Sequence, residues 1–160
     1  LSPTEGWVLS AGSLLWTTDG GETWRDITPP ETSGAPYWDV FFLEANVGWV
    51  ALLSAPEGDA LPIQILHTQD GGTTWSTSEF EAVLSPGVFG TAEYLEFVDP
   101  LHGWLSVGQT LTMNSSAADL YRTSDGGLTW ETVGGKRVTM LGSTPVRRVD
   151  AILNTEDVVA

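Results

Sequence analysis

One eight-residue stretch occurs three times in this chain, and its repetition is the strongest constraint on the fold. The copies span residues 17–24, 68–75 and 123–130, and six of the eight positions are identical in all three. The aspartates at their third positions lie 51 and then 55 residues apart. Self-similarity at such a period predicts an array of similar structural units.

Each copy has the composition of a tight β-hairpin. Asp-Gly-Gly is a strong turn signal between two apolar runs. The glycines can adopt positive φ without steric cost, and the aspartate can accept hydrogen bonds from N–H groups a few residues later. The tryptophan starts the next strand and is expected to pack between neighbouring units. We assign structural roles to Asp19, Gly21, Trp24, Asp70, Gly72, Trp75, Asp125, Gly127 and Trp130.

The stretch resembles the Asp-box, or bacterial neuraminidase repeat. That resemblance implies a β-propeller, because Asp-boxes typically join the third and fourth strands of propeller blades. Sialidases, sortilin-type receptors, xyloglucanases and photosystem II stability/assembly factor-like proteins carry the motif. A second recurring feature, an apolar strand followed by Gly-Trp as at Gly48-Trp49 and Gly103-Trp104, looks most like the last of these.

We therefore expect one all-β domain over residues 1–160, built of four-stranded antiparallel blades of the β-propeller type. Unit 1 is expected at about 1–30, unit 2 at about 37–80, unit 3 at about 91–135 and the start of a further unit at about 146–160. Single-chain propellers generally need four or more blades to close their ring. About three blades predict either a partial propeller or one completed by oligomerisation.

The composition disfavours several function classes. The chain has no cysteine, which removes disulfide and thiolate-metal chemistry. Its net charge of −15 disfavours nucleic acid as a partner, since a phosphate-binding face needs a basic patch. The sequence has no apolar run long enough to span a membrane. We expect no metal or cofactor, and an extracytoplasmic or secreted location whose targeting segment is absent from this chain.

The expected working face lies opposite the Asp-boxes. Successive strands of a blade run antiparallel, so the first-to-second and third-to-fourth connections share one end. The segments that vary in length fall at the other end: 54–62, 109–118, 28–36 and 78–91. Binding residues concentrate in such loops. The alternative is that these loops are merely tolerated insertions.

Candidate site residues are few. The Asp-box carboxylates recur in every unit, whereas catalysis needs a single constellation, so they are not assigned to it. A glycosidase needs two carboxylates at a suitable separation, and Asp39, Glu93 and Glu96 lie in or beside first strands. Trp16 and Trp38 fall outside the two recurring tryptophan positions and are candidates for exposed recognition.

Two function hypotheses follow. The leading one is a non-catalytic binding or assembly scaffold that contacts a protein or glycan through the loops opposite the Asp-boxes, with homo-oligomerisation as an option. The alternative is a fragment of a glycoside hydrolase or sialidase-like propeller enzyme whose remaining blades supply the chemistry. In the first hypothesis no residue of this chain is catalytic.

Overall fold

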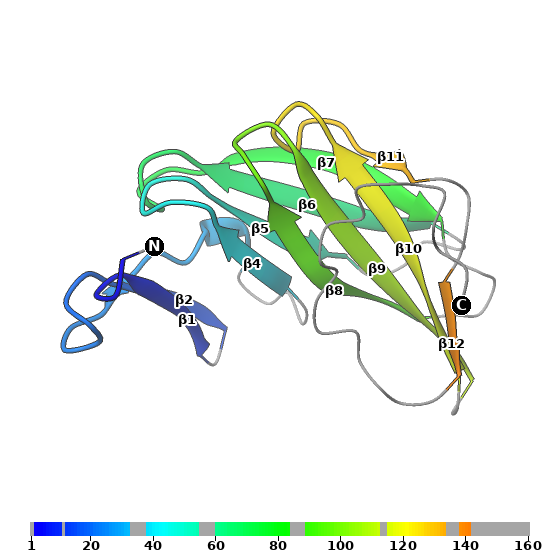
Figure 1. Ribbon diagram of the computed structural model, residues 1–160, viewed down its shortest axis with the longest axis horizontal. Helices are drawn as coiled ribbons and strands as arrows, with labels where there is room; N and C mark the ends of the chain where they lie inside the picture. The colour runs from blue at the N-terminus through cyan, green and yellow to red at the C-terminus, as the bar shows by residue number, and fades with distance from the viewer. Residues whose placement is uncertain are drawn as a thin grey trace.

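The computed structural model describes residues 2–10, 12–32, 38–54, 60–83, 89–112, 115–133 and 138–141. These residues form three antiparallel sheets that follow one another along the chain (Figure 1), with a single short 3₁₀ helix at Pro30–Thr32 in the described part. The all-β fold of propeller-type repeats is thereby confirmed. The further unit expected at 146–160 lies outside the described residues.

Each sheet is one repeat unit, with its strands in sequence order. Unit 1 contains β1 (Gly6–Ser10), β2 (Ser13–Thr17) and β3 (Arg25–Asp26). Unit 2 contains β4 (Trp38–Phe42), β5 (Gly48–Leu53), β6 (Ala60–Thr68) and β7 (Ser76–Val83). Unit 3 contains β8 (Phe89–Phe97), β9 (Gly103–Thr112), β10 (Ser115–Thr123), β11 (Glu131–Thr132) and β12 (Val138–Leu141), the last two both pairing with β10.

The strands of units 2 and 3 are longer than the sequence predicted. The segment 109–118, expected to be a loop, is mostly the continuation of β9 and β10, and only residues 113–114 separate these strands. Likewise β6 begins at Ala60, and β7 extends to Val83. The expectation of long loops here is wrong because the antiparallel ladder continues past the polar residues. Apolar residues such as Leu61 and Ala117 stay buried within it.

The core lies between the units. One buried cluster joins units 1 and 2 through Leu14, Ile27, Phe42 and Val50, among others. A second cluster joins units 2 and 3. All six residues of β5 are buried, and alternate positions of the strand belong to different clusters. Unit 2 therefore has one face covered by unit 1 and the opposite face covered by unit 3, since successive side chains point to opposite faces of a sheet.

An aromatic ring lies over a glycine at each of these junctions. Phe42 pairs across the ladder with Gly48, and Phe97 pairs with Gly103. A Cβ atom on Gly48 would lie 2.4 Å from Cδ1 of Phe42, and one on Gly103 would lie 2.6 Å from Cδ1 of Phe97. Only glycine leaves room for the ring at this distance. The Phe97 ring also stacks on Trp49 of unit 2, with centroids 3.7 Å apart.

Adding one methyl group at Gly48 should therefore destabilise the fold. We expect Gly48→Ala to lower the free energy of unfolding by about 1–3 kcal/mol, the usual cost of overpacking a core. Urea denaturation measures this change. In a Phe42→Leu background the same substitution should cost less than half as much, because the side chains are coupled through one contact. Equal costs in both backgrounds would contradict the proposed contact.

Candidate functional site

The Asp-Gly-Gly turns are closed by their own hydrogen bonds. In the second copy the Thr68 hydroxyl donates to Asp70 Oδ1 over 2.9 Å and accepts from the Gly72 N–H over 2.8 Å. The Asp70 carboxylate also accepts from the N–H and the hydroxyl of Thr74, at 2.8 and 2.7 Å. The first and third copies repeat this set around Asp19 and Asp125. These carboxylates therefore hold the turns.

The same hydrogen bonds keep two of these aspartates ionised. The Thr23 hydroxyl, followed by the Thr23 N–H, lowers the pKa of Asp19 from 3.8 to about 2. The Thr74 N–H, followed by the Thr74 hydroxyl, lowers the pKa of Asp70 in the same way to about 2. A carboxyl group with so low a pKa is a poor general acid at neutral pH.

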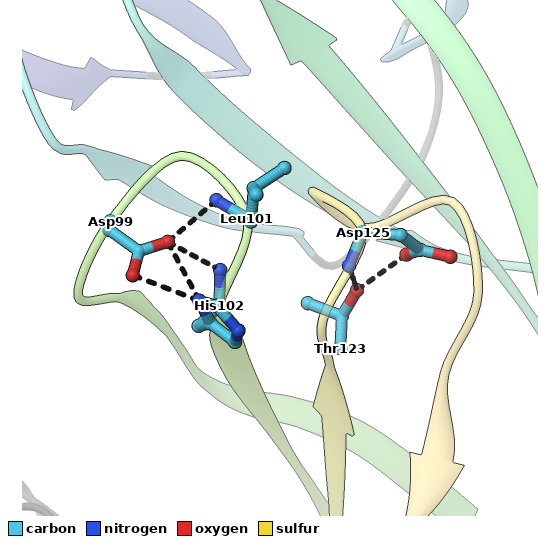
Figure 2. Close-up of polar contacts among 5 residues, drawn as sticks. All are labelled: Asp99, Leu101, His102, Thr123 and Asp125. Atoms are coloured by element: carbon cyan, nitrogen blue, oxygen red, sulfur yellow. Dashed lines mark hydrogen bonds and ion pairs between the residues drawn. The ribbon is translucent and has the colours of Figure 1, made fainter.

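A second turn lies beside each Asp-Gly-Gly turn. Figure 2 shows the pair in unit 3, where the Asp99 carboxylate accepts from the N–H groups of Leu101 and His102, each at 2.8 Å. The two turns are joined because the Gly126 N–H donates to the Leu101 carbonyl over 2.9 Å. The equivalent bonds run from Gly71 to Asn46 and from Gly20 to Thr4. As the strand directions predicted, the two kinds of turn share one end of every unit.

A cleft of about 380 Å³ opens at this end between units 1 and 2. It is lined by Glu5, Trp16, Thr18, Thr23, Trp24, Arg25, Ala45, Asn46, Asp70 and Gly71. Its position differs from the face predicted for binding, which lies at the opposite end of the strands. No local sequence pattern predicts the cleft, because its lining comes from turns of two different units.

Some polar side chains of the cleft make hydrogen bonds within the protein, and others do not. Arg25 Nη2 donates to the Gly71 carbonyl over 2.7 Å, so this guanidinium ties unit 1 to unit 2. The Asp70 carboxylate is held in its turn. In contrast, the side chains of Thr18 and Asn46 make no hydrogen bond with any residue that the structure describes. The cleft thus offers a hydroxyl and a carboxamide beside an aromatic wall.

The predicted tryptophan sites need correction. Trp16, expected to be exposed, is 4% exposed, and its ring centroid lies 4.9 Å from that of Phe42. It is buried because the unit 1 face that carries it is covered by unit 2. Trp24, expected to pack between units, is 44% exposed. Trp38 belongs to β4, but its side chain falls outside the described residues.

The two other Asp-box tryptophans do pack against aromatic residues. Trp75 makes an edge contact with Phe42, with centroids 6.5 Å apart. Trp130 contacts Phe97 of its own unit and Phe80 of the preceding one, at 6.1 and 5.7 Å. Trp130 therefore packs between units 2 and 3, as expected for an Asp-box tryptophan.

The candidate glycosidase carboxylates do not form a shared site in the described part of the chain. Asp39 Oδ2 accepts from the Leu95 N–H over 2.6 Å, and its Oδ1 accepts from the Val40 N–H over 2.9 Å. Burial raises the pKa of Asp39, and these two bonds oppose that rise. Glu96 accepts instead from the Tyr94 hydroxyl. Asp39 therefore links β4 to β8, and the Glu93 side chain lies outside the described residues.

Neither a metal centre nor a membrane-spanning helix is found among the described residues. They contain no group of three or more His, Cys, Asp or Glu side chains arranged to hold a metal ion. None of their helices is long and apolar enough to cross a membrane.

Comparison with known proteins places similar sequences among xyloglucanases. The chain is 28% identical over 152 residues to a xyloglucanase from Paenibacillus sp, a match that covers 83% of this chain and 14% of that protein. It is 26% identical over 152 residues to the xyloglucanase Xgh74A of Acetivibrio thermocellus, covering 83% of this chain and 17% of that protein. The chain thus spans less than a fifth of the length of either relative.

No protein-family model matches the chain. Among solved structures, one described as YCF48 bound to D1 peptide is 25% identical, with a TM-score of 0.48, and the match covers 82% of this chain and 36% of that one.

The depressed aspartate pKa values predict acid sensitivity. Because the pKa of Asp70 is about 2 in the fold and 3.8 without these contacts, its contribution to stability is complete above about pH 5 and is lost as pH falls toward 2. We expect Asp70→Asn to lower the melting temperature at pH 7. Its melting temperature should also fall less than that of the wild type between pH 5 and 2. Circular dichroism melts measure both, and parallel pH profiles would contradict the assignment.

Proposed function

We propose that this chain is a non-catalytic binding scaffold of the propeller type and that the cleft between units 1 and 2 holds a glycan. The observation that carries the proposal is a cleft at the junction of units 1 and 2. It has an aromatic side chain in its wall and polar side chains that make no hydrogen bond within the described residues. Trp24, which is 44% exposed, contributes the aromatic surface, and Thr18 and Asn46 contribute the free hydroxyl and carboxamide.

The chemistry of the cleft suits a neutral sugar. A volume of about 380 Å³ is at the lower end of the usual range for ligand sites, which combine apolar or aromatic walls with a few polar groups. Sugar hydroxyls can exchange hydrogen bonds with a carboxamide and a hydroxyl. The net charge of −15 disfavours an anionic ligand. The similar xyloglucanases are named for a polysaccharide substrate, which supports a glycan as the ligand here.

Binding is favoured over catalysis because the carboxylates of the cleft are already engaged. Asp70 is held by its own turn, and Glu5 accepts a hydrogen bond from the Ser2 N–H over 3.3 Å. Outside the cleft, Asp39 is tied to backbone N–H groups. A glycosidase needs one carboxyl group as acid and another as base or nucleophile. A polysaccharide ligand also supports the proposal that the protein works outside the cytoplasm.

The second candidate function is a segment of a glycoside hydrolase. The 28% identity to a xyloglucanase favours it, and there the rest of a longer protein would supply the catalytic groups. Hydrolysis of fluorogenic glycosides by the 160-residue chain, abolished in Asp39→Asn or Glu93→Gln, would favour this function over a binding scaffold.

The glycan proposal is tested by calorimetric titration with xyloglucan oligosaccharides. We expect measurable binding to the chain and roughly threefold to tenfold weaker binding by Asn46→Ala, since one lost hydrogen bond costs about 0.5–1.5 kcal/mol. Leu128→Ala is the matched control, because Leu128 is 67% exposed in the third Asp-box, away from the cleft. No binding, or binding that Asn46→Ala leaves unchanged, would contradict the proposal. Retention of a peptide library instead would indicate a protein partner.

A further inference from the structure

Three stacked rings join units 2 and 3. The Trp49 indole of unit 2 stacks on the Phe97 ring of unit 3, with centroids 3.7 Å apart and planes 5° apart. The His67 imidazole stacks on the same indole, with centroids 4.8 Å apart and planes 6° apart. His67 lies directly across the ladder from Trp49, so the imidazole is part of the packing at this junction.

The indole of this stack also makes a polar contact across the junction. Trp49 is fully buried, and its N–H donates to the Gly126 carbonyl of unit 3 over 2.9 Å. The Ser78 hydroxyl donates to the next carbonyl, that of Gly127, over 2.6 Å. A movement that uncovers Trp49 therefore weakens a hydrogen bond between the units as well as the ring stack.

The position of His67 carries a different residue in each unit. It is occupied by Trp16 in unit 1 and by Arg122 in unit 3. Trp16 is 4% exposed and packs against Phe42 of unit 2, whereas Arg122 forms an ion pair with Glu131. A ring at this position thus packs at both junctions, and of the two rings only the imidazole can change its charge near neutral pH.

The His67 ring has a buried nitrogen without a hydrogen-bond partner. Its Nε2 atom is out of contact with solvent and makes no hydrogen bond with any described residue. A neutral imidazole can leave this nitrogen unprotonated, whereas an imidazolium carries an N–H group on both nitrogens. Protonation in the stack would therefore leave a charged donor buried and unpaired, which is costly. Burial accordingly lowers the pKa of His67 from 6.5.

No acidic side chain offsets a charge on His67 in the described part of the chain. β5 contains no titratable residue. In β7, Glu79 and Glu81 lie on the other face of the sheet, because His67 pairs with Ser76 and successive side chains alternate. The titratable residues of the neighbouring first strands and turns have other partners, and none forms an ion pair with His67. They are Asp39, Asp70, Glu96, Asp99, His102 and Asp125.

We propose that His67 is a pH switch at the junction between units 2 and 3. The neutral ring stacks on Trp49 and keeps the junction closed. The protonated ring leaves the stack for solvent, which it can reach because the residue is only partly buried. Trp49 is then uncovered, and its hydrogen bond to Gly126 weakens. Mild acid thus loosens this junction, whereas the junction of units 1 and 2, with Trp16 at this position, keeps its packing.

Nuclear magnetic resonance of the 160-residue chain tests the switch. The sequence contains two histidines, His67 and His102, so His102→Gln leaves one imidazole to titrate. We expect a midpoint for His67 below 6.5, the value for an unburied histidine. Over the same pH range the Trp49 indole N–H should lose its protection against hydrogen exchange. A midpoint at or above 6.5 would overturn the proposal, because cation–π attraction to Trp49 would then outweigh burial. Unchanged protection of the indole N–H would overturn it as well.

Urea denaturation measures the effect of the switch on stability. A histidine whose pKa is lower in the fold than in the unfolded chain stabilises the fold above the unfolded value, and this contribution is lost as the pH falls below it. Between about pH 7.5 and 5, the unfolding constant of the wild type should therefore rise about 3- to 30-fold more than that of His67→Phe. The variant keeps an aromatic ring beside Trp49, and titration of Asp39 is common to both proteins.

Two further variants complete this comparison. His67→Trp introduces the residue that unit 1 has at this position and should also lose the extra rise in the unfolding constant. His102→Gln is the control, because His102 is exposed in a turn, and it should retain most of the rise. Equal pH dependence in the wild type and in the folded His67 variants would contradict the switch.

Discussion

The structure depends on one contact, an aromatic ring that lies over a glycine of its own unit and packs against the unit before it. Phe97 shows it fully, because its ring is over Gly103 and stacks on Trp49. Phe42 repeats it over Gly48, with Trp16 of unit 1 as its neighbour. Since core packing tolerates no extra methyl group at such sites, the contact fixes how closely successive units approach.

The Asp-Gly-Gly turns contribute to the same junctions in a second way. Their aspartates use both carboxylate oxygens inside the turn, whereas a glycine carbonyl of the second and of the third turn accepts a hydrogen bond from the preceding unit. Arg25 donates to the Gly71 carbonyl, and Trp49 donates to the Gly126 carbonyl. The turns are therefore docking points between units. The second and third copies of the motif therefore have a structural role at these two junctions.

The proposed function uses the junction between units 1 and 2. The cleft lies where units 1 and 2 meet, so its shape depends on how tightly these units pack. Its available polar groups are the side chains that make no hydrogen bond across the junction. An array of this kind can bind a ligand between two neighbouring units, because each unit packs against the next one.

The sequence by itself determined the repeat period, the hairpin turns, the all-β class and the end at which the Asp-Gly-Gly turns lie. These features are local, since Asp19, Asp70 and Asp125 each find their hydrogen-bond partners within a few residues. It could not predict that Trp16 is buried or that residues 109–118 are mostly strand. Both depend on neighbouring strands and units that cover these residues. The cleft likewise arises only when turns of two units meet, so the tertiary structure alone decided its position, because its lining residues are distant in the sequence.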